Sequence, residues 1–260
     1  MSCKSLFSTN VSIGRIRKLF SQNINLLLIE DHPQICRLLQ DDFFQSPVFN
    51  KKSVHTVDEA KRAISGSSPV HCWIVDLTLE QHNDGLELIK LKPNFPYRVV
   101  VSGAQSMSDA TEALKAGAYS VYDKKNIFLS DPHKFIEETC ALSILSFIFK
   151  ARRPMKFELF QVLIQGFITT SESWSNSCWI NERTFRRLCE EESFLTVKQF
   201  LSLYHALNAI VLSDCLLPGM PGFEGIREKI IQRIDYYGQC AHYVVDHLDS
   251  VFGPRYLKQF

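Results

Sequence analysis

Residues 24–125 alternate short apolar runs, rich in β-branched side chains, with longer segments whose apolar positions recur every three to four residues. The first pattern predicts buried strands and the second predicts amphipathic helices. Strands are expected at 24–30, weakly at 53–57, and at 72–75, 98–102 and 119–123, and helices at 32–44, 57–65, 85–91 and 108–117. This alternation predicts a doubly wound, five-stranded parallel sheet, with a further helix from Pro132.

Beyond about residue 150 the alternation stops and helical patterns take over, separated by polar or Gly/Pro-rich breaks. We therefore expect an α/β domain at 24–150, an all-α domain at 151–260 and an N-terminal helical extension at 1–23. The segment VSIGRIRKLF (11–20) has one apolar face. Packing on the first domain and a dimer contact both fit that face.

Composition adds a cellular setting. Hydrophobic residues make up 45% of the 260 residues, which supports real cores. The eight cysteines are scattered without a CxxC pair, as in proteins whose thiols stay reduced. The longest apolar stretch late in the chain, 139–149, is about half of the roughly 20 residues that a membrane span needs. We expect a cytoplasmic protein with no membrane partner.

Charged and hydroxyl side chains stand where the predicted strands end. The first strand ends at Glu30-Asp31, the third at Asp76, the fourth at Ser102, and the fifth just before Lys124. Taken singly, each has an ordinary explanation as a helix cap, a turn residue or a solvated side chain. Parallel strands, however, deliver their carboxyl ends to one edge of the sheet, and the sequence therefore predicts one site there.

The predicted site suits phosphoryl chemistry. Three close carboxylates repel one another and need a cation, and hard oxygen ligands suit Mg²⁺. Ser102 and Lys124 offer a hydroxyl and an ammonium for phosphoryl oxygens. Attack by the Asp76 carboxylate on a phosphoryl group would give an aspartyl phosphate.

Residues 24–125 resemble the receiver domain of two-component response regulators. The resemblance rests on LLLIEDHP, WIVDL, DGLELI (84–89), VVVSGA (99–104) and AGAYSVYDKK (116–125). It implies that Asp76 is the phosphoacceptor, that Glu30, Asp31 and Asp76 bind Mg²⁺ with the backbone carbonyl of Thr78, and that Ser102 and Lys124 contact the phosphoryl group. It also implies a sensor histidine kinase or phosphotransfer protein as the phosphoryl source.

The chain departs from the receiver pattern in the parts that surround the site. The loop from Asp76 to Gly85 is one residue longer than usual and carries Glu80 where a proline is common. Lys125 also stands where receivers normally have proline, and the usual aromatic switch position is Val121. The acidic site is intact, so we expect phosphorylation, whereas the route by which the signal leaves it stays open.

The segment 179–212 predicts two helices around a break, with Asn181 as an N-cap. It resembles the first helix-turn-helix of AraC-type transcription regulators, and residues 230–260 resemble their second, around Gly238 and Phe252-Gly253. The resemblance implies two helix-turn-helix units that bind promoter DNA, and half-site geometry favours a phosphorylation-dependent homodimer. It nominates these DNA contacts: Asn181, Glu182, Arg183, Arg186 and Arg187 in the first unit, and Gln239, Cys240 and His242 in the second.

The charge of this region leaves a second function open. The usual Phe-Lys pair is Cys189-Glu190, the turn glycine is Phe194, and Asp246 and Asp249 accompany the second unit. Residues 151–260 hold 12 Lys and Arg against 12 Asp and Glu, whereas DNA-binding domains usually show a basic stripe. A signalling adaptor that binds protein is the alternative. An aspartate-based phosphatase fits least, because those enzymes show an Asp-x-Asp pattern and this chain has Thr78 at the second position. We expect no enzymatic turnover.

Overall fold

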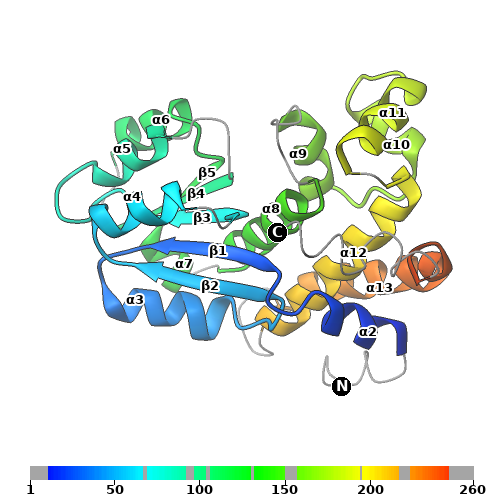
Figure 1. Ribbon diagram of the computed structural model, residues 1–260, viewed down its shortest axis with the longest axis horizontal. Helices are drawn as coiled ribbons and strands as arrows, with labels where there is room; N and C mark the ends of the chain where they lie inside the picture. Colours follow the sequence, from blue (N-terminus) through cyan, green and yellow to red (C-terminus); the bar gives the residue numbers. More distant parts are fainter. Residues whose placement is uncertain are drawn as a thin grey trace.

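The structure is a computed structural model, and it describes residues 11–66, 69–91, 97–103, 106–129, 132–149, 157–193, 195–216 and 223–245. Its centre is a parallel sheet of order β2-β1-β3-β4-β5 (Figure 1). The strands are β1 (Ile24–Ile29), β2 (Phe49–Val54), β3 (Cys72–Val75), β4 (Tyr97–Ser102) and β5 (Ser120–Asp123). The order is that of flavodoxin-like doubly wound sheets, so the predicted α/β fold is confirmed.

Helices cover both faces of the sheet. One face is covered by α3 (Pro33–Arg37), the π-helix η1 (Leu38–Phe43) and α8 (His133–Phe149), and the other by α4 (Val57–Ser65), α5 (Asp84–Leu91) and α6 (Met107–Lys115). Strand residues alternate between the two sides: Leu26 and Leu28 join the core beneath α8, whereas Leu27 and Ile29 pack with α4. The strands β1, β3 and β4 are buried on both faces, which explains their nearly continuous apolar sequences, whereas the edge strands β2 and β5 are partly exposed and more polar.

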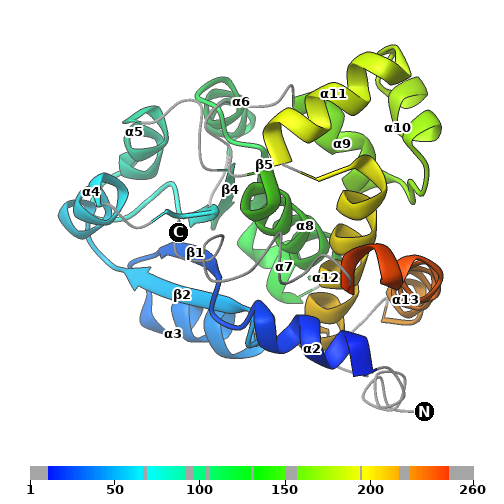
Figure 2. The same cartoon turned by 45° about the vertical axis from the view of Figure 1, so that its right-hand side comes forward.

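The C-terminal region is helical, as predicted. It consists of α9 (Phe157–Gln165), α10 (Ser171–Ser177), α11 (Glu182–Ser193), α12 (Val197–Cys215) and α13 (Phe223–Val245). Figure 2 shows α12 running between α8 and α13, and it contacts both helices. Helix α8 contacts the strands on its other side, so the core that begins beneath the sheet continues into the C-terminal helices without a break. A domain division near residue 150 stays a prediction.

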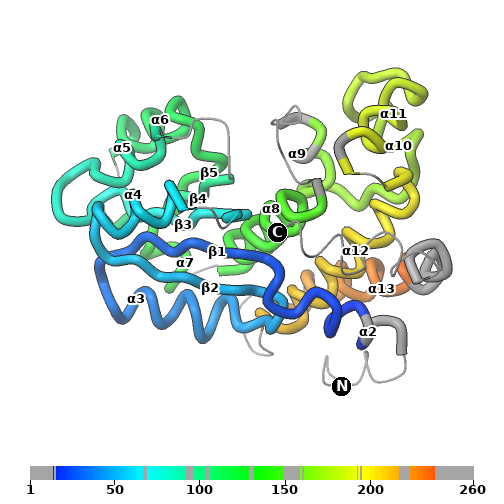
Figure 3. Tube along the Cα trace, in the orientation of Figure 1, coloured from blue at the N-terminus to red at the C-terminus, as the bar shows by residue number. Residues whose placement is uncertain are grey.

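The N-terminal segment forms α2 (Val11–Leu19), which packs within the chain (Figure 3). Its Arg17 forms an ion pair with Asp214 of α12 at 2.6 Å, and the ring of Phe20 meets that of Phe147 of α8 at 5.5 Å. Ile16 and Phe20 are fully buried. The apolar face was expected either to pack on the first domain or to form a dimer contact. In the structure it packs within the chain, against α8 and α12, the helices that join the sheet to the C-terminal region.

One predicted strand was misplaced, and one helix was not predicted. The second strand spans Phe49–Val54 and not 53–57, because Thr56 caps α4: its hydroxyl accepts a hydrogen bond from the amide of Glu59 at 3.2 Å. The sequence also did not predict α7 (Lys124–Leu129), which follows β5 directly. The carboxylate of Asp123 accepts a hydrogen bond from the amide of Lys125 at 2.7 Å, a bond that the proline usual at position 125 could not make.

The second helix-turn-helix is not formed as expected around Gly238. Helix α13 runs from Phe223 to Val245 without interruption, so Gln239, Cys240 and His242 lie in its C-terminal part and do not open a recognition helix. Isolated glycines are tolerated inside helices at a cost of about 1 kcal/mol relative to alanine. The remainder of that motif, with Asp246 and Asp249, and the turn residue Phe194 lie outside the described residues.

Two buried histidines make the fold sensitive to acid. Nδ1 of His71 accepts a hydrogen bond from the amide of Asn25 at 2.8 Å, and Nε2 of His205 lies 2.7 Å from the carbonyl of Ile168. Burial lowers the pKa of each imidazole to about 3. Both side chains are therefore neutral in the folded protein at neutral pH.

Stability should fall as the pH drops below the unfolded-state pKa of about 6.5, because the unfolded chain then binds protons that the native state excludes. At pH 5 the loss is about 2 kcal/mol for each histidine. Urea unfolding of the wild type, His71→Gln and His205→Gln at pH 7 and pH 5 tests this. Each variant should show a smaller difference between the two pH values, and an unchanged difference would contradict the assignment.

Candidate functional site

Three carboxylates meet at the carboxyl ends of β1 and β3. Glu30 and Asp76 are 2% and 5% exposed, Asp31 is exposed, and one carboxylate oxygen from each lies within 4.8 Å of the others. The backbone brings them together, since the amide of Asp76 donates to the carbonyl of Ile29 at 2.9 Å and so continues the β1–β3 pairing past the end of β3. The structure thus assembles the acidic cluster that the strand ends predicted.

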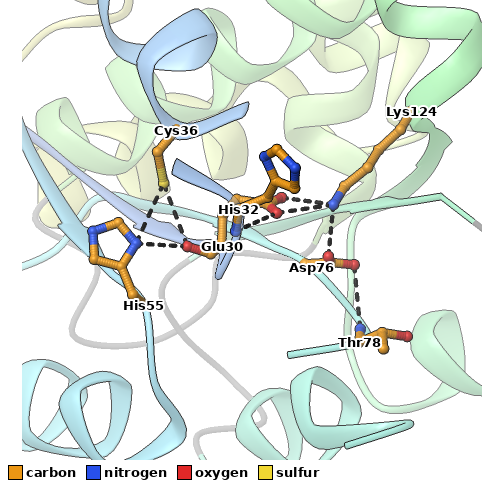
Figure 4. A network of polar contacts seen from close by, with 7 residues as sticks. All are labelled: Glu30, His32, Cys36, His55, Asp76, Thr78 and Lys124. Atoms are coloured by element: carbon orange, nitrogen blue, oxygen red, sulfur yellow. Dashed lines mark hydrogen bonds and ion pairs between the residues drawn. The ribbon is translucent and has the colours of Figure 1, made fainter. Parts of the chain in front are cut away.

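Lys124 joins the two buried carboxylates (Figure 4). Its ammonium nitrogen lies 2.6 Å from Oδ2 of Asp76 and 3.0 and 2.8 Å from the two carboxylate oxygens of Glu30. Lys124 follows β5, two strands away from β3 in the sheet, so only the fold brings this ammonium to Asp76. One ammonium among three carboxylates leaves the cluster negative.

Burial governs the electrostatics of the cluster. Desolvation raises the pKa of Glu30 to about 7, against the opposing effect of the Lys124 ammonium. Burial alone would lower the pKa of Lys124, but its hydrogen bonds to Asp76 and Glu30 raise it above the ordinary value. A second cation at the cluster would favour the charged form of Glu30, because an adjacent opposite charge stabilises a carboxylate.

The donor set fits a hard divalent cation. It consists of carboxylate oxygens on two adjacent strands, with Asp31 open to solvent, and such sites hold ions that keep part of their water shell. Thr78 is close by, since its amide donates to Oδ1 of Asp76 at 3.2 Å. The role of its carbonyl as a ligand stays a prediction.

Ser102 ends β4 on the other side of the cluster. It is 2% exposed and stands in register with Asp123 of β5, the residue before Lys124. The following residue, Gly103, lies beside the side chain of Lys124. A Cβ added to Gly103 would be in ordinary van der Waals contact with Cδ of Lys124, at 3.7 Å. Ser102 and Lys124 therefore belong to neighbouring strand ends, as expected. Val121 stands at the position where an aromatic switch residue was expected from the resemblance. It is half-buried and packs against the core beneath α5 and α6.

Gly85 of the DGLELI motif is needed for close packing. A Cβ at this position would lie 2.8 Å from the carbonyl carbon of Asp76 and 2.8 Å from Cα of Leu77. The amide of Gly85 donates to the carbonyl of Leu77 at 3.1 Å and closes the loop that follows β3. In the lengthened loop Glu80, which replaces a proline, accepts a weak hydrogen bond from the amide of Val57 at 3.4 Å.

Two residues beside the cluster were not predicted from the sequence. His55 and Cys36 contact the backbone carbonyl of Glu30 on the side away from Lys124 (Figure 4). They come from the loop after β2 and from α3, and no spacing along the sequence relates them. Cys36 lies within the predicted helix 32–44 and His55 within the predicted strand 53–57, so neither stood out as a side chain at the end of a strand.

The predicted DNA contacts of the first unit lie on α11. Asn181 is its N-cap, because Oδ1 accepts a hydrogen bond from the amide of Arg183 at 3.0 Å. Arg183, Arg186 and Arg187 are exposed. Two of them pair within the helix, Arg186 with Glu182 at 2.7 Å and Arg187 with Glu191 at 3.7 Å. The side chains of Gln239, Cys240 and His242 lie outside the described ones. The DNA-binding role of all these residues stays a prediction.

No family model and no curated protein matches the chain. Among solved structures it is similar to the receiver domain of a Francisella response regulator, at 17% identity over 46% of this chain and 97% of that one, with a TM-score of 0.40. A phosphorylated response regulator from Burkholderia pseudomallei shares 21% identity over 63% and 96%, with a TM-score of 0.38. The Salmonella typhimurium response regulator RcsB shares 17% over 70% and 98%, with a TM-score of 0.39.

All three TM-scores are below 0.5, and the fold assignment comes from the strand order itself. Residues 24–149 have a receiver fold. Among the described residues, no helix combines the length and the apolar character that crossing a membrane requires.

Removing the ammonium of the receiver site should be costly. Lys124→Met leaves two buried carboxylates facing each other, and breaking a buried ion pair typically destabilises a protein by about 3 kcal/mol or more. The urea midpoint at pH 8 should fall accordingly. Because protonation of Glu30 relieves the repulsion, the loss should be smaller at pH 5.

The matched control is Lys125→Met, which removes an exposed ammonium one residue away. It should change stability by less than about 0.5 kcal/mol. Equal effects of the two substitutions would contradict a special role of the Lys124 contacts.

Proposed function

We propose that the chain is a response regulator whose receiver takes up a phosphoryl group on Asp76 in the presence of Mg²⁺, from a sensor histidine kinase or phosphotransfer protein. The observation that carries the proposal is the contact of one ammonium with two buried carboxylates beside a third: Lys124 with Asp76 and Glu30, next to Asp31. A purely structural ion pair would need only one carboxylate. The surplus negative charge suits a site that binds a cation and a phosphoryl group.

The proposed step is an in-line displacement. A carboxylate oxygen of Asp76 forms the new bond to phosphorus while the bond from phosphorus to the donor breaks, and the donor leaves with the electron pair. Glu30 and Asp31, with Asp76, would hold Mg²⁺, which neutralises phosphoryl oxygens when bound. Lys124 and the Ser102 hydroxyl would contact the remaining oxygens.

The helical region is placed to respond. Lys124 opens α7, and the chain then continues into α8, which contacts both the sheet and α12. A phosphoryl group on Asp76 competes with Glu30 for the Lys124 ammonium, and we infer that the resulting shift passes through α7 and α8 to the C-terminal helices. Bistable packing of this kind turns small displacements into changes of interface.

For the output we propose promoter binding through α10 and α11, in a phosphorylation-dependent homodimer. The support is a helix capped by Asn181 with three exposed arginines, and the ion pairs of Arg186 and Arg187 within α11 are exposed. Exposed pairs four residues apart contribute only about 0.3–0.5 kcal/mol, so DNA phosphates can replace the glutamates.

A protein-binding adaptor is the second candidate, and Trp179 favours it. This residue, in the turn between α10 and α11, is 96% exposed and has a φ of 55°. Its amide donates to Asn176 and that of Ile180 to Ser175, which is the pattern of a helix C-terminus that normally carries glycine. Exposure and backbone strain at one large aromatic residue point to an interaction surface, and tryptophan is enriched at protein interfaces.

The deciding experiment is enrichment of fragmented genomic DNA by the purified full chain, with and without a small acyl phosphate and Mg²⁺. Wild type should enrich specific fragments when phosphorylated, and Asp76→Asn should not. Uptake of phosphoryl by Asp76 without any enrichment would reject the promoter-binding output and support the adaptor. Absence of phosphoryl uptake would reject the receiver function itself.

Trp179→Gly tests whether the positive φ of this residue costs stability. Glycine adopts positive φ freely, so the variant should be more stable than wild type by about 1 kcal/mol in urea unfolding. Asn83→Gly is the matched control: Asn83 has a φ of 67°, but asparagine tolerates this conformation, and its gain should be clearly smaller. If Trp179→Gly is less stable than wild type, the ring contributes to folding and the case for an interaction surface is lost.

A further inference from the structure

The backbone carbonyl of Glu30 lies where the pairing of β1 with β2 ends. The amide of Glu30 still donates to the carbonyl of Val54 at 3.1 Å. In a regular parallel ladder its carbonyl would next accept the amide two residues beyond Val54. The chain turns into α4 here instead: the carboxylate of Glu59 accepts a hydrogen bond from the amide of His55 at 2.8 Å, and Thr56, whose amide the ladder would have used, is the N-cap of α4. Capping of α4 therefore removes the partner that the sheet would have supplied.

Two side chains take the place of that amide. Nδ1 of His55 lies 2.9 Å from the carbonyl oxygen of Glu30, and Sγ of Cys36 lies 3.4 Å from the same oxygen. A carbonyl oxygen only accepts hydrogen bonds, so both groups must donate and Nδ1 of His55 must carry a proton. The sulfur and Nδ1 are 3.8 Å apart, close enough for both to contact one oxygen.

These contacts hold the backbone of the acidic pair, Glu30 and Asp31, on the side away from Lys124. The carbonyl belongs to the peptide unit that joins Glu30 to Asp31, so fixing it fixes the orientation in which both carboxylates leave the backbone. Figure 4 places His55 and Cys36 on one side of Glu30, and Lys124 and Asp76 on the other. The carboxylate side is held separately, by Lys124 and by the amide of His32 at 3.2 Å from Oε1 of Glu30.

We propose that His55 and Cys36 are positioning residues, which set the geometry of the Glu30–Asp31 pair for the divalent cation of the phosphoacceptor site. Neither side chain contacts the reacting atoms. The inference rests on the proposed receiver function, and it adds that cation affinity is governed from a loop between β2 and α4. His55 is exposed, so solvent reaches this positioning residue without passing through the acidic cluster.

The test compares Mg²⁺ binding by calorimetry on the full chain for wild type, His55→Leu and His55→Asn. Leucine fills the space of the ring without a donor, whereas the side-chain amide of asparagine can donate from the position of Nδ1. His55→Leu should bind Mg²⁺ about tenfold more weakly, the low end of effects seen when partners of metal ligands are removed. His55→Asn should stay within about twofold of wild type.

Cys36 has its own matched pair. Cys36→Ala should weaken Mg²⁺ binding by less than His55→Leu, because a thiol is a weak donor, and Cys36→Ser should restore it. Thermal unfolding without Mg²⁺ should be similar for the leucine and asparagine variants of His55. With saturating Mg²⁺, phosphorylation of Asp76 from an acyl phosphate should return to the wild-type rate in both.

A readout without metal completes the test. The ¹⁵N chemical shifts of the His55 ring should show a proton on Nδ1, and a ring protonated on Nε2 alone would overturn the proposal. So would equal Mg²⁺ affinity of wild type and His55→Leu, or equal loss in the leucine and asparagine variants. If wild type takes up phosphoryl in either case, the receiver function stands and only the positioning role falls. If wild type binds no Mg²⁺ and Asp76 takes up no phosphoryl, both fall.

Discussion

Helix α8 is apolar on nearly every side and must therefore be covered on nearly every side. Its residues from 139 to 148 are all buried, and a helix of this kind is stable only inside a protein core. The sheet covers one side and α12 covers another. Small side chains let the layers approach closely, and the hydroxyl of Ser143 is satisfied within the helix by the carbonyl of Thr139 at 2.6 Å.

This constraint ties the C-terminal helices to the receiver fold. The link is reinforced by charge: Lys229 and Arg233 of α13 lie 2.9 and 3.8 Å from the carboxylate of Glu137 on α8. On the opposite side Asp214 of α12 accepts hydrogen bonds from Arg17 and from Ser46, at 2.6 and 2.8 Å. Helix α8 and the C-terminal helices therefore share one core.

In the acidic cluster, too, a few partners are shared. Glu30 and Asp76 are buried and share a single ammonium, so a group that draws Lys124 toward Asp76 weakens its hold on Glu30. Burial raises the pKa of Glu30 to about 7. The carbonyl of the same residue is contacted by His55 and Cys36. Glu30 thus connects the lysine on one side with α3 and the loop after β2 on the other.

The sequence by itself determined four of the five strands, most of the helices that cover them and the residues of the acidic edge, but it misplaced β2 and did not predict α7. Periodicity identifies strands and helices because burial imposes it locally, and parallel strands must send Asp76, Ser102 and Lys124 to one edge. It also determined the N-cap at Asn181, since capping needs only neighbouring residues.

Only the tertiary structure decided the relations between distant segments. Two contacts at the start of α4 ended β2 early: the hydroxyl of Thr56 accepts from the amide of Glu59, and the carboxylate of Glu59 accepts from the amide of His55. No pattern within the strand records these contacts. Likewise, α13 continues through Gly238 where a resemblance of local sequence suggested a turn. The sequence predicted a helix from Pro132, and its apolar stretch does not say that α12 provides the cover, because burial has no direction along the chain.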